Sequence, residues 1–272
     1  MNILVTINKS YIKHLKTLIS SIKKSNPKEL FKIYLFHRDL SKKDINGIKL
    51  ILNENITLFP IKIQNEEINN YPVYEERYPV EIYFRIFASI YLPKDVDRIL
   101  YLDTDIIVIN KLNKLYNMDF EDNYYIASTN IGPVMHKFNE LRLGLGKKHP
   151  YINSGVLLIN IQKLRNIEIK DKVNNFIKKK KNVLMLPDQD IISALYGSKI
   201  KVIDNLKYNL SDKALNIHNL KNLNNKIDLE WVRKNTTIIH YYGKNKPWNK
   251  NYKGILNCFY NEVAKEVEYE KI

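Results

Sequence analysis

The sequence predicts one α/β domain whose mostly parallel, twisted sheet is flanked by helices. Its first hundred residues alternate short apolar runs with amphipathic helical patterns. This βαβαβ order is typical of parallel strands joined by right-handed crossovers. The chain has 272 residues, of which 44% are hydrophobic, so it can bury one large core. No internal repeat or linker-like stretch divides it.

Three strands and two helices are expected in the N-terminal part. The strands are predicted at residues 1–7, 31–36 and 56–63, where branched and aromatic side chains form short apolar runs. One helix is predicted over residues 11–25 by apolar residues at helical spacing, and another after Ser41, which begins a typical helix N-terminus. Ligands of parallel sheets bind beyond the carboxyl ends of the strands. Residues 8–11, which follow the first strand, are therefore expected to face a ligand.

The domain is organised around residues 98–110, which read RILYLDTDIIVIN. Two apolar, strand-like runs are separated here by Asp103, Thr104 and Asp105. Two carboxylates between buried strands are costly unless they are paired. A divalent cation removes that cost, because oxygens at positions i and i+2 can converge on it. An ordinary strand-end turn, where aspartate is common, is the alternative interpretation.

A helix is predicted over residues 80–91, ending before Pro93. It carries Arg85 on an otherwise apolar surface. This arginine either flanks the core with its aliphatic stem or binds a phosphate or sugar.

Two further strands are predicted after the aspartates. One covers residues 124–128 and leads to Asn130; the other covers 151–160, and its polar entry holds Asn153 and Ser154. The segment 132–150 between them has little periodicity and is predicted to be a lid-like insertion.

The C-terminal part contains two more candidate site segments. A helix is predicted to open near residue 186, where Asp188 suits the N-cap position and its polar neighbours could instead reach a sugar. His240 ends a predicted strand and precedes a turn with a glycine, two lysines and a tryptophan, which favours a ligand role. The tail is amphipathic. We expect a main domain at residues 1–250 and a helical tail at 251–272 packed on it.

Glycine-rich phosphate-binding patterns are absent from the sequence. Neither G-x-G-x-x-G after the first strand nor G-x-x-x-x-G-K anywhere occurs. Phosphates would then be held by a metal on the paired aspartates. The single cysteine, Cys258, excludes an internal disulfide framework and a cysteine-based zinc site.

The net charge of +15 suggests nucleic acid as a partner, but other features argue against it. Only seven of the 44 basic residues are arginines, the lysines are spread along the chain, and no nucleic-acid-binding motif accompanies them. A basic face also suits anionic lipid head groups or nucleotides. The sequence has no signal-peptide pattern and no run of about 18 apolar residues. We expect a cytoplasmic protein, with room for peripheral contact at the inner face of the membrane.

Taken together, these motifs resemble the family 8 retaining glycosyltransferases, which have a Rossmann-like GT-A fold. The similarity runs from Met1 to about Trp248. It rests on the turn at residues 8–11 after the first strand, the Arg85 helix, YLDTDIIV, YINSGVLLIN, LPDQD and HYYGKNKPW, in the same order. The nearest branch is the bacterial one that adds hexoses to cell-surface glycans and lipooligosaccharides.

The resemblance implies a role for each residue of the candidate site. The implied metal ligands are Asp103, Asp105 and His240. The implied donor-binding residues are Asn8 and Tyr11 at the uridine, Thr104 beside the metal, and Gly243 and Lys246 at the diphosphate. The implied catalytic residues, which hold or face the donor sugar, are Arg85, Asn153, Asp188 and Gln189. Gln189 would stabilise the oxocarbenium-like sugar rather than form a covalent bond. Asn8 and Asn130 depart from the branch, which often has aspartate at both positions.

The implied activity is metal-dependent transfer of galactose or glucose, with retention, from a UDP-hexose to a hydroxyl of a cell-surface glycan or lipooligosaccharide. Mn²⁺, or Mg²⁺, is the expected cofactor, and no oligomeric state is indicated. Two other hypotheses remain. A haloacid-dehalogenase-like phosphatase also has a DxD after an apolar strand, although normally after its first strand. A catalytically lapsed nucleotide-sugar-binding protein would keep the same fold.

Overall fold

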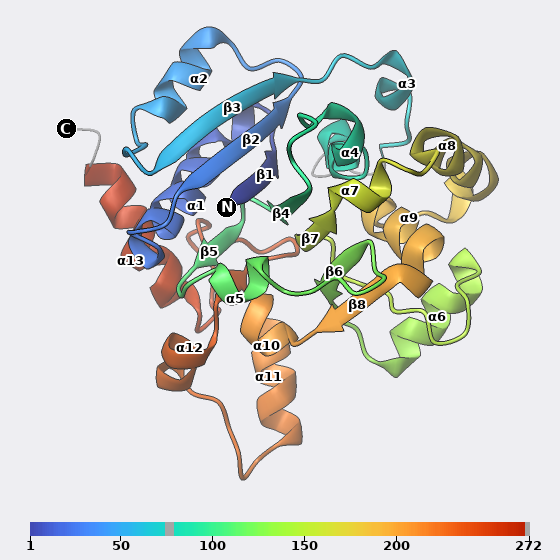
Figure 1. Cartoon of the computed structure of the whole chain (residues 1–272). Coiled ribbons are helices and arrows are strands. Elements are labelled where there is room, and N and C mark those ends of the chain that lie inside the picture. Colours follow the sequence, from blue (N-terminus) through green and yellow to red (C-terminus); the bar gives the residue numbers. More distant parts are fainter. Residues whose placement is uncertain (74–78, 270–272) are drawn as a thin grey trace.

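The structure is a computed structural model that describes residues 1–73 and 79–269. A seven-stranded sheet with the order β3-β2-β1-β4-β7-β6-β8 forms its centre, and a two-stranded sheet of β5 and β9 lies beside it (Figure 1). The strands of the large sheet are β1 (Asn2–Thr6), β2 (Phe31–His37), β3 (Ile56–Lys62), β4 (Arg98–Leu102), β6 (Tyr125–Ser128), β7 (Val156–Asn160) and β8 (Ile200–Ile203). Those of the small sheet are β5 (Ile106–Val108) and β9 (Ile238–His240).

Most neighbouring strands run parallel. β1 pairs in parallel with β2 and β4, β2 with β3, and β6 with β8. β7 is antiparallel to both of its neighbours, β4 and β6. Because β7 runs in the opposite direction, the turn that enters it lies at the carboxyl end of β4. The predicted mostly parallel α/β sheet is confirmed.

Helices connect the strands, and α2 begins where the sequence predicts. The Oγ of Ser41 accepts a hydrogen bond from the Asp44 N–H at 3.1 Å, and the Asp44 carboxylate accepts one from the Ser41 N–H at 3.0 Å. The α-helices are α1 (Ile12–Ser25), α2 (Lys42–Lys49), α3 (Glu66–Asn69), α4 (Ala88–Tyr91), α5 (Asn113–Tyr116), α6 (Pro133–Leu143), α7 (Ile161–Leu164), α8 (Ile169–Lys180), α9 (Pro187–Tyr196), α10 (Asn205–Tyr208), α11 (Asp212–Lys221), α12 (Leu229–Asn235) and α13 (Asn257–Tyr269). The 3-10 helices are η1 (Lys9–Tyr11), η2 (Val80–Arg85), η3 (Lys181–Val183) and η4 (Gly197–Lys199).

Side chains of the central strands alternate between two cores, one on each face of the large sheet. In β4, Ile99 and Tyr101 belong to one core, and Leu100 and Leu102 to the other. The first core is covered by η2, α4, α7, α8 and α9, and the second by α1, α2 and α5. Burial on both faces explains why the parallel strands read as continuous apolar runs. A third core joins the small sheet to α11, α12 and α13.

Residues 80–91 do not form the single helix that was predicted. The chain winds as η2 and then starts α4 after Phe87. Backbone bonds here span three residues, as in the 3.0 Å bond from Ile86 N–H to the Tyr83 carbonyl. The tighter winding buries Tyr83 in the core while the Arg85 guanidinium reaches the Ser154 carbonyl at 3.0 Å.

The predicted insertion at 132–150 contains a helix, α6. Pro133 lies in its first turn, and Gly144, with φ of 74°, ends it. Its helical periodicity is weak because both of its sides carry apolar residues: Leu143 is buried, whereas Leu141 is 73% exposed. The sequence pattern therefore did not reveal it.

Two strand predictions also differ from the structure. The strand expected at 151–160 begins only at Val156, because the Asn153 Oδ1 accepts the Gly155 N–H at 3.1 Å and folds the entry into a turn. The four-residue strand β8, at the edge of the sheet, was not predicted from the sequence.

The C-terminal tail forms α13, which packs against α1 and buries Phe259 and Val263 in the third core. The last residues of the predicted tail, 270–272, lie outside the described residues. The boundary between 1–250 and 251–272 stays a prediction. Across the described ranges, no helix combines the length and apolar character needed to span a membrane.

Candidate active site

A pocket of about 380 Å³ lies at the carboxyl ends of β1 and β4. The turn after β1, η2, the turn before β7, the start of α9 and the loop after β9 contribute to its wall. All residues that the sequence analysis assigned to the site line this pocket: Asn8, Tyr11, Arg85, Asp103, Thr104, Asp105, Asn153, Asp188, Gln189, His240, Gly243 and Lys246.

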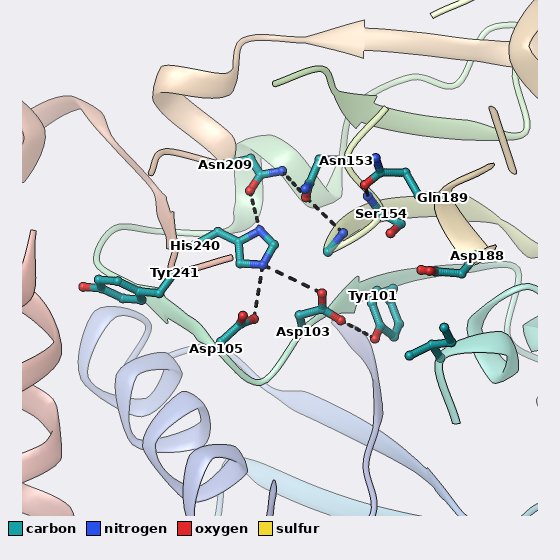
Figure 2. Close-up of polar contacts among 12 residues, drawn as sticks. Tyr101, Asp103, Asp105, Asn153, Ser154, Asp188, Gln189, Asn209, His240 and Tyr241 are labelled. Atoms are coloured by element: carbon teal, nitrogen blue, oxygen red, sulfur yellow. Dashed lines mark hydrogen bonds and ion pairs between the residues drawn. The ribbon is translucent and has the colours of Figure 1, made fainter. Parts of the chain in front are cut away.

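Asp103, Asp105 and His240 form a compact cluster in the pocket. Asp103 follows β4, and Asp105 precedes β5, whose antiparallel pairing with β9 places Ile106 opposite His240. One potential ligand atom from each of the three lies within 4.8 Å of the others. The His240 Nε2 is 3.1 Å from the Asp105 Oδ1 and 3.8 Å from the Asp103 Oδ2 (Figure 2).

A chain of hydrogen bonds determines which nitrogen of His240 carries a proton. The Gly155 N–H donates to the Asn153 Oδ1, which must therefore accept from the Asn209 Nδ2 at 2.9 Å. That orientation turns the Oδ1 of the fully buried Asn209 toward the His240 Nδ1, 2.8 Å away (Figure 2). Since an amide oxygen only accepts, the proton lies on Nδ1.

The other nitrogen, Nε2, then directs a lone pair at two carboxylates. It is buried and has no hydrogen-bond donor among the described residues. Three electron-pair donors facing one another are repulsive unless a cation lies between them or the ring takes a second proton. Two carboxylates and one imidazole are ligands that suit a divalent cation, and the imidazole favours Mn²⁺ over Mg²⁺. The cluster therefore fits a metal site.

Arg85 lies between two carboxylates of the pocket. Its Nη1 is 3.0 Å from the Asp103 Oδ1 and 3.3 Å from the Asp188 Oδ2. Its guanidinium also covers the Tyr101 ring, 4.1 Å from the ring centroid. Burial disfavours the cation, but the attraction of Asp103 and Asp188 outweighs burial and raises the pKa of Arg85. Arg85 is thus a fixed positive charge within the site.

Asp188 is not the N-cap that the sequence suggested. Leu186 occupies the cap position of α9, and the Asp190 carboxylate accepts from the N–H groups of Met185 and Leu186 at 2.8 and 3.3 Å. Asp188 is the second residue of the helix, and its side chain faces Arg85 instead. Burial raises the pKa of Asp188 against the attraction of that arginine.

Gln189 and Asn153 lie side by side with their carbonyl oxygens already engaged. The Gln189 Oε1 accepts from the Ser154 N–H at 3.3 Å. The Asn153 Oδ1 accepts from both Gly155 and Asn209. A ligand therefore meets Asn153 chiefly as a hydrogen-bond donor.

The turn after β1 supplies Asn8 and Tyr11. Asn8 caps η1, since its Oδ1 accepts from the N–H and the Oγ of Ser10 at 3.0 and 2.6 Å. Thr104 is 8% exposed, between the two aspartates.

The loop after β9 supplies Gly243 and Lys246. Gly243 has φ of 99°, a conformation that favours glycine. The Lys246 ammonium contacts the Asp105 carboxylate and donates to the Tyr241 carbonyl at 3.0 Å. Burial opposes ionisation of Asp105, but His240, when its ring carries a second proton, and the Lys246 ammonium outweigh burial and lower the pKa of Asp105. Lys246 thus pairs with one of the three side chains that could hold a metal.

Three residues that shape the site were not predicted from the sequence. Asn209 orients His240 from the end of α10, where no motif occurs. A Cβ at Gly155 would overlap the His240 imidazole, so the close approach needs glycine. The Tyr101 hydroxyl donates to the Asp103 Oδ1 at 2.6 Å. Tyr101 could have been found, because residues two apart on a strand share a face.

Known proteins resemble this chain over most of its length. The model of the family described as Glycosyl transferase family 8 matches residues 2–252. A lipopolysaccharide 1,2-glucosyltransferase of Escherichia coli is 25% identical over 237 residues, which cover 85% of this chain and 68% of that protein. A lipopolysaccharide 1,3-galactosyltransferase of Salmonella typhimurium is 25% identical over 254 residues, covering 91% and 73%. A crystal structure of the galactosyltransferase LgtC with donor and acceptor sugar analogues has a TM-score of 0.83 and 23% identity, covering 98% of this chain and 96% of that one.

Proposed function

This chain belongs to glycosyl transferase family 8, and we propose that it moves galactose or glucose from a UDP-sugar to a hydroxyl of a cell-surface glycan or lipooligosaccharide, with retention. Membership makes the protein a glycosyltransferase, and its fold is the GT-A fold that the sequence resemblance implied. The names of its lipopolysaccharide glucosyl- and galactosyltransferase relatives support the choice of sugar and acceptor class.

The observation that carries the proposal is the Asp103–Asp105–His240 cluster, whose buried imidazole lone pair faces two carboxylates. A divalent metal held there would neutralise the charge that grows on the departing diphosphate. Lys246 would move its ammonium from Asp105 to the diphosphate. Gly243 would let the backbone approach it closely, and the turn after β1 would hold the uridine through Asn8 and Tyr11.

The sugar would lie between η2 and α9. Arg85 holds the Asp188 carboxylate in place, and that carboxylate would accept hydrogen bonds from the sugar hydroxyls. Asn153 would donate to the sugar, and the Gln189 amide would stabilise positive charge at the anomeric carbon. The acceptor oxygen would attack from the side on which the diphosphate leaves. Because attack and departure take place on the same face, the anomeric configuration would be retained, and the acceptor proton would pass to the departing phosphate oxygen.

The phosphatase hypothesis is not favoured, because the chain belongs to a transferase family and its DxD follows β4 rather than the first strand. The remaining rival is a lapsed protein that binds the donor without using it.

The test measures UDP release and product from UDP-galactose and UDP-glucose, with a lipooligosaccharide-derived acceptor and Mn²⁺. The wild type should transfer one of the two hexoses and give an α-linkage by NMR. Asp105→Asn should abolish transfer and metal-dependent UDP binding while its circular dichroism stays native. An inverted linkage, full activity of Asp105→Asn, or donor binding by the wild type without any turnover would overturn the proposal.

A further inference from the structure

The helix α6 has apolar side chains on its inner and outer sides. Leu143 packs inward and is 2% exposed. Val134, Phe138 and Leu141 face outward and are 83%, 46% and 73% exposed. Their i, i+4, i+7 spacing places the three on one face of the helix. A surface helix of a globular protein normally presents polar residues on its outward face, so this apolar face of α6 is unusual.

The loop before α9 extends this face. The Arg142 Nη1 donates to the Val183 carbonyl at 2.6 Å, which holds the loop against α6. Met135 on α6 and Met185 on the loop are 47% and 53% exposed. We define the outer apolar patch as Val134, Met135, Phe138, Leu141, Val183 and Met185.

Lysines occur on α6 and on the segments that adjoin the outer apolar patch. Lys137 lies within α6, Lys147 and Lys148 follow it, and residues 178–181 form the run of four lysines at the end of α8. The fold brings this run to α6, because the Lys180 Nζ donates to the Arg142 carbonyl at 3.4 Å. The one acidic residue of α6, Glu140, pairs with Lys137. Apart from this pair, the segments beside the patch carry an excess of positive charge.

The patch also adjoins the active-site pocket. Met185 is followed by Leu186, which lines the pocket, and α6 begins three residues after Asn130 at the carboxyl end of β6. Figure 1 shows α6 at the edge of the molecule beside α9. A surface held against the patch would thus lie near the pocket opening.

We propose that the outer apolar patch binds the surface of an anionic lipid bilayer, with its apolar side chains in the interfacial layer and its lysines among the head groups. Apolar residues bordered by lysines are the combination that favours such surfaces. The inference rests on the proposed function for its purpose, since a lipooligosaccharide acceptor is anchored in a bilayer by its lipid.

The charge pattern argues against a second copy of the chain as the occupant. In a two-fold contact the same patch meets itself, so each lysine border would face the other lysine border. Like charges placed opposite each other across an interface are strongly unfavourable. An anionic bilayer has the complementary charge.

The test uses sedimentation of the purified full chain with vesicles of phosphatidylcholine alone or mixed with phosphatidylglycerol. The wild type should bind the mixed vesicles, and more weakly at high salt. It should not bind the vesicles of phosphatidylcholine alone. The double variant Phe138→Glu/Leu141→Glu should lower partitioning by at least about tenfold, because two interfacial contacts become charged. Lys178→Gln and Lys179→Gln should each lower it by about fivefold.

Leu220→Glu is the matched control. The exposed fraction of Leu220, 75%, is similar to that of Leu141, 73%. Leu220 lies on α11, which points away from the large sheet in Figure 1. This variant should bind vesicles as the wild type does. Circular dichroism and UDP binding should stay unchanged in all variants, which excludes misfolding as the cause of lost partitioning.

Three outcomes would overturn the inference: no binding of the wild type to mixed vesicles, equal losses in Leu220→Glu and the α6 double variant, or a wild-type dimer that the α6 variant dissociates without any change in vesicle binding. The vesicles contain no acceptor and the readout needs no turnover. Vesicle binding by a chain that transfers no hexose would therefore defeat the proposed function alone.

Discussion

Asn209 links Asn153 to His240 by hydrogen bonds and orients the His240 ring. It is fully buried and fixes the proton on Nδ1, so that Nε2 keeps its lone pair for a metal. We predict that Asn209→Ala weakens Mn²⁺ binding by about 10- to 100-fold, the usual effect of removing such a partner. Isothermal titration with Mn²⁺ in the absence of any sugar measures it directly.

Two further variants separate orientation from simple loss of packing. Asn209→Asp keeps an acceptor for the Nδ1 proton and should recover most of the Mn²⁺ affinity. Asn205→Ala removes a nearby asparagine that bonds to Asn130 at 3.2 Å rather than to the histidine, and it should bind Mn²⁺ normally. If all three variants bind Mn²⁺ equally, Asn209 does not orient the ligand.

Lys246 should affect metal and nucleotide in opposite directions. Its ammonium contacts Asp105, so in the absence of nucleotide it competes with a cation for that carboxylate. We predict that Lys246→Ala binds Mn²⁺ more tightly on its own. With Mn²⁺ present, the variant should bind UDP more weakly by about 1–3 kcal/mol, the scale of a charge-assisted hydrogen bond. Uridine binding should hardly change.

The exposed Lys244, two residues away, provides the matched control, and Lys244→Ala should alter neither affinity. Equal losses of UDP and uridine affinity in Lys246→Ala would show that the ammonium does not act on the diphosphate.

The residues of the site differ in how far the sequence could reveal them. Asp103 and Asp105 were predictable, since two carboxylates between apolar runs are costly to bury unless a cation or a hydrogen-bond donor pairs with them. His240 was predictable from its place at a strand end before a glycine turn. Asn209 was not, because its role depends on burial and on a partner 31 positions later, and neither leaves a local pattern.

At the scale of elements, α1 is joined to the loop after β9 by His14 and Trp248. Their rings are stacked with centroids 3.6 Å apart, and the His14 Nδ1 is buried without a hydrogen-bond partner. Burial lowers the pKa of His14 from 6.5 to about 4. The folded state thus favours neutral His14, while the unfolded chain takes up a proton as the pH falls below about 6.5.

This difference predicts that the contribution of His14 to stability is full above pH 6.5 and is lost as the pH falls toward 4. His14→Gln cannot take up that proton. At pH 7 its Tm should lie about 2–4 °C below that of the wild type, because the ring stacking is lost. The deficit should shrink as the pH is lowered. A deficit that stays constant between pH 7 and 5 in thermal melts would contradict the pKa of His14.

Elements were predictable where one apolar face or a cap defines them. The strands 31–37 and 56–62 and the cap at Ser41 are examples. The helix α6 was not predictable, because its outer apolar residues cancel the periodicity of the inner ones. The break between η2 and α4 accompanies the contact of the buried Arg85 with the Ser154 carbonyl. The spacing of apolar residues in the sequence does not reveal such a contact.

For the whole molecule, the pocket lies where the parallel strands β3-β2-β1-β4 meet the strands β7-β6-β8. A ligand there contacts both groups of strands and should stabilise the entire fold. At a concentration of about 100 times its Kd, a ligand that binds only the folded state adds about 2.7 kcal/mol to the free energy of unfolding. We expect this gain to raise the Tm by roughly 5–10 °C.

We predict this shift for Mn²⁺ together with UDP, and its reversal by EDTA. Asp105→Asn should show no metal-dependent part of the shift. An equal shift with UDP and EDTA would mean that the nucleotide binds without the metal. Differential scanning fluorimetry of both proteins supplies the comparison.

The order of the large sheet could be predicted only in part. The alternation of strands and helices implies parallel pairing of β1, β2 and β3. The reversed β7 does not follow from it, since its apolar run would fit either direction. Direction is decided by the short turn from Asn153 to Gly155, whose carbonyl accepts the Asp103 N–H at 2.9 Å.

The pairing of β5 with β9 has a consequence for when the proposed metal site can form during synthesis. Ile106 and His240 are neighbours in space but almost half the chain apart in sequence. During synthesis the first four strands of the large sheet's parallel part can associate early, because their contacts close shorter loops. His240, the third residue of the proposed metal site, emerges from the ribosome much later. A nascent chain interrupted before β9 would carry both aspartates and the turn proposed to bind uridine, yet it would lack His240, which completes the proposed metal site.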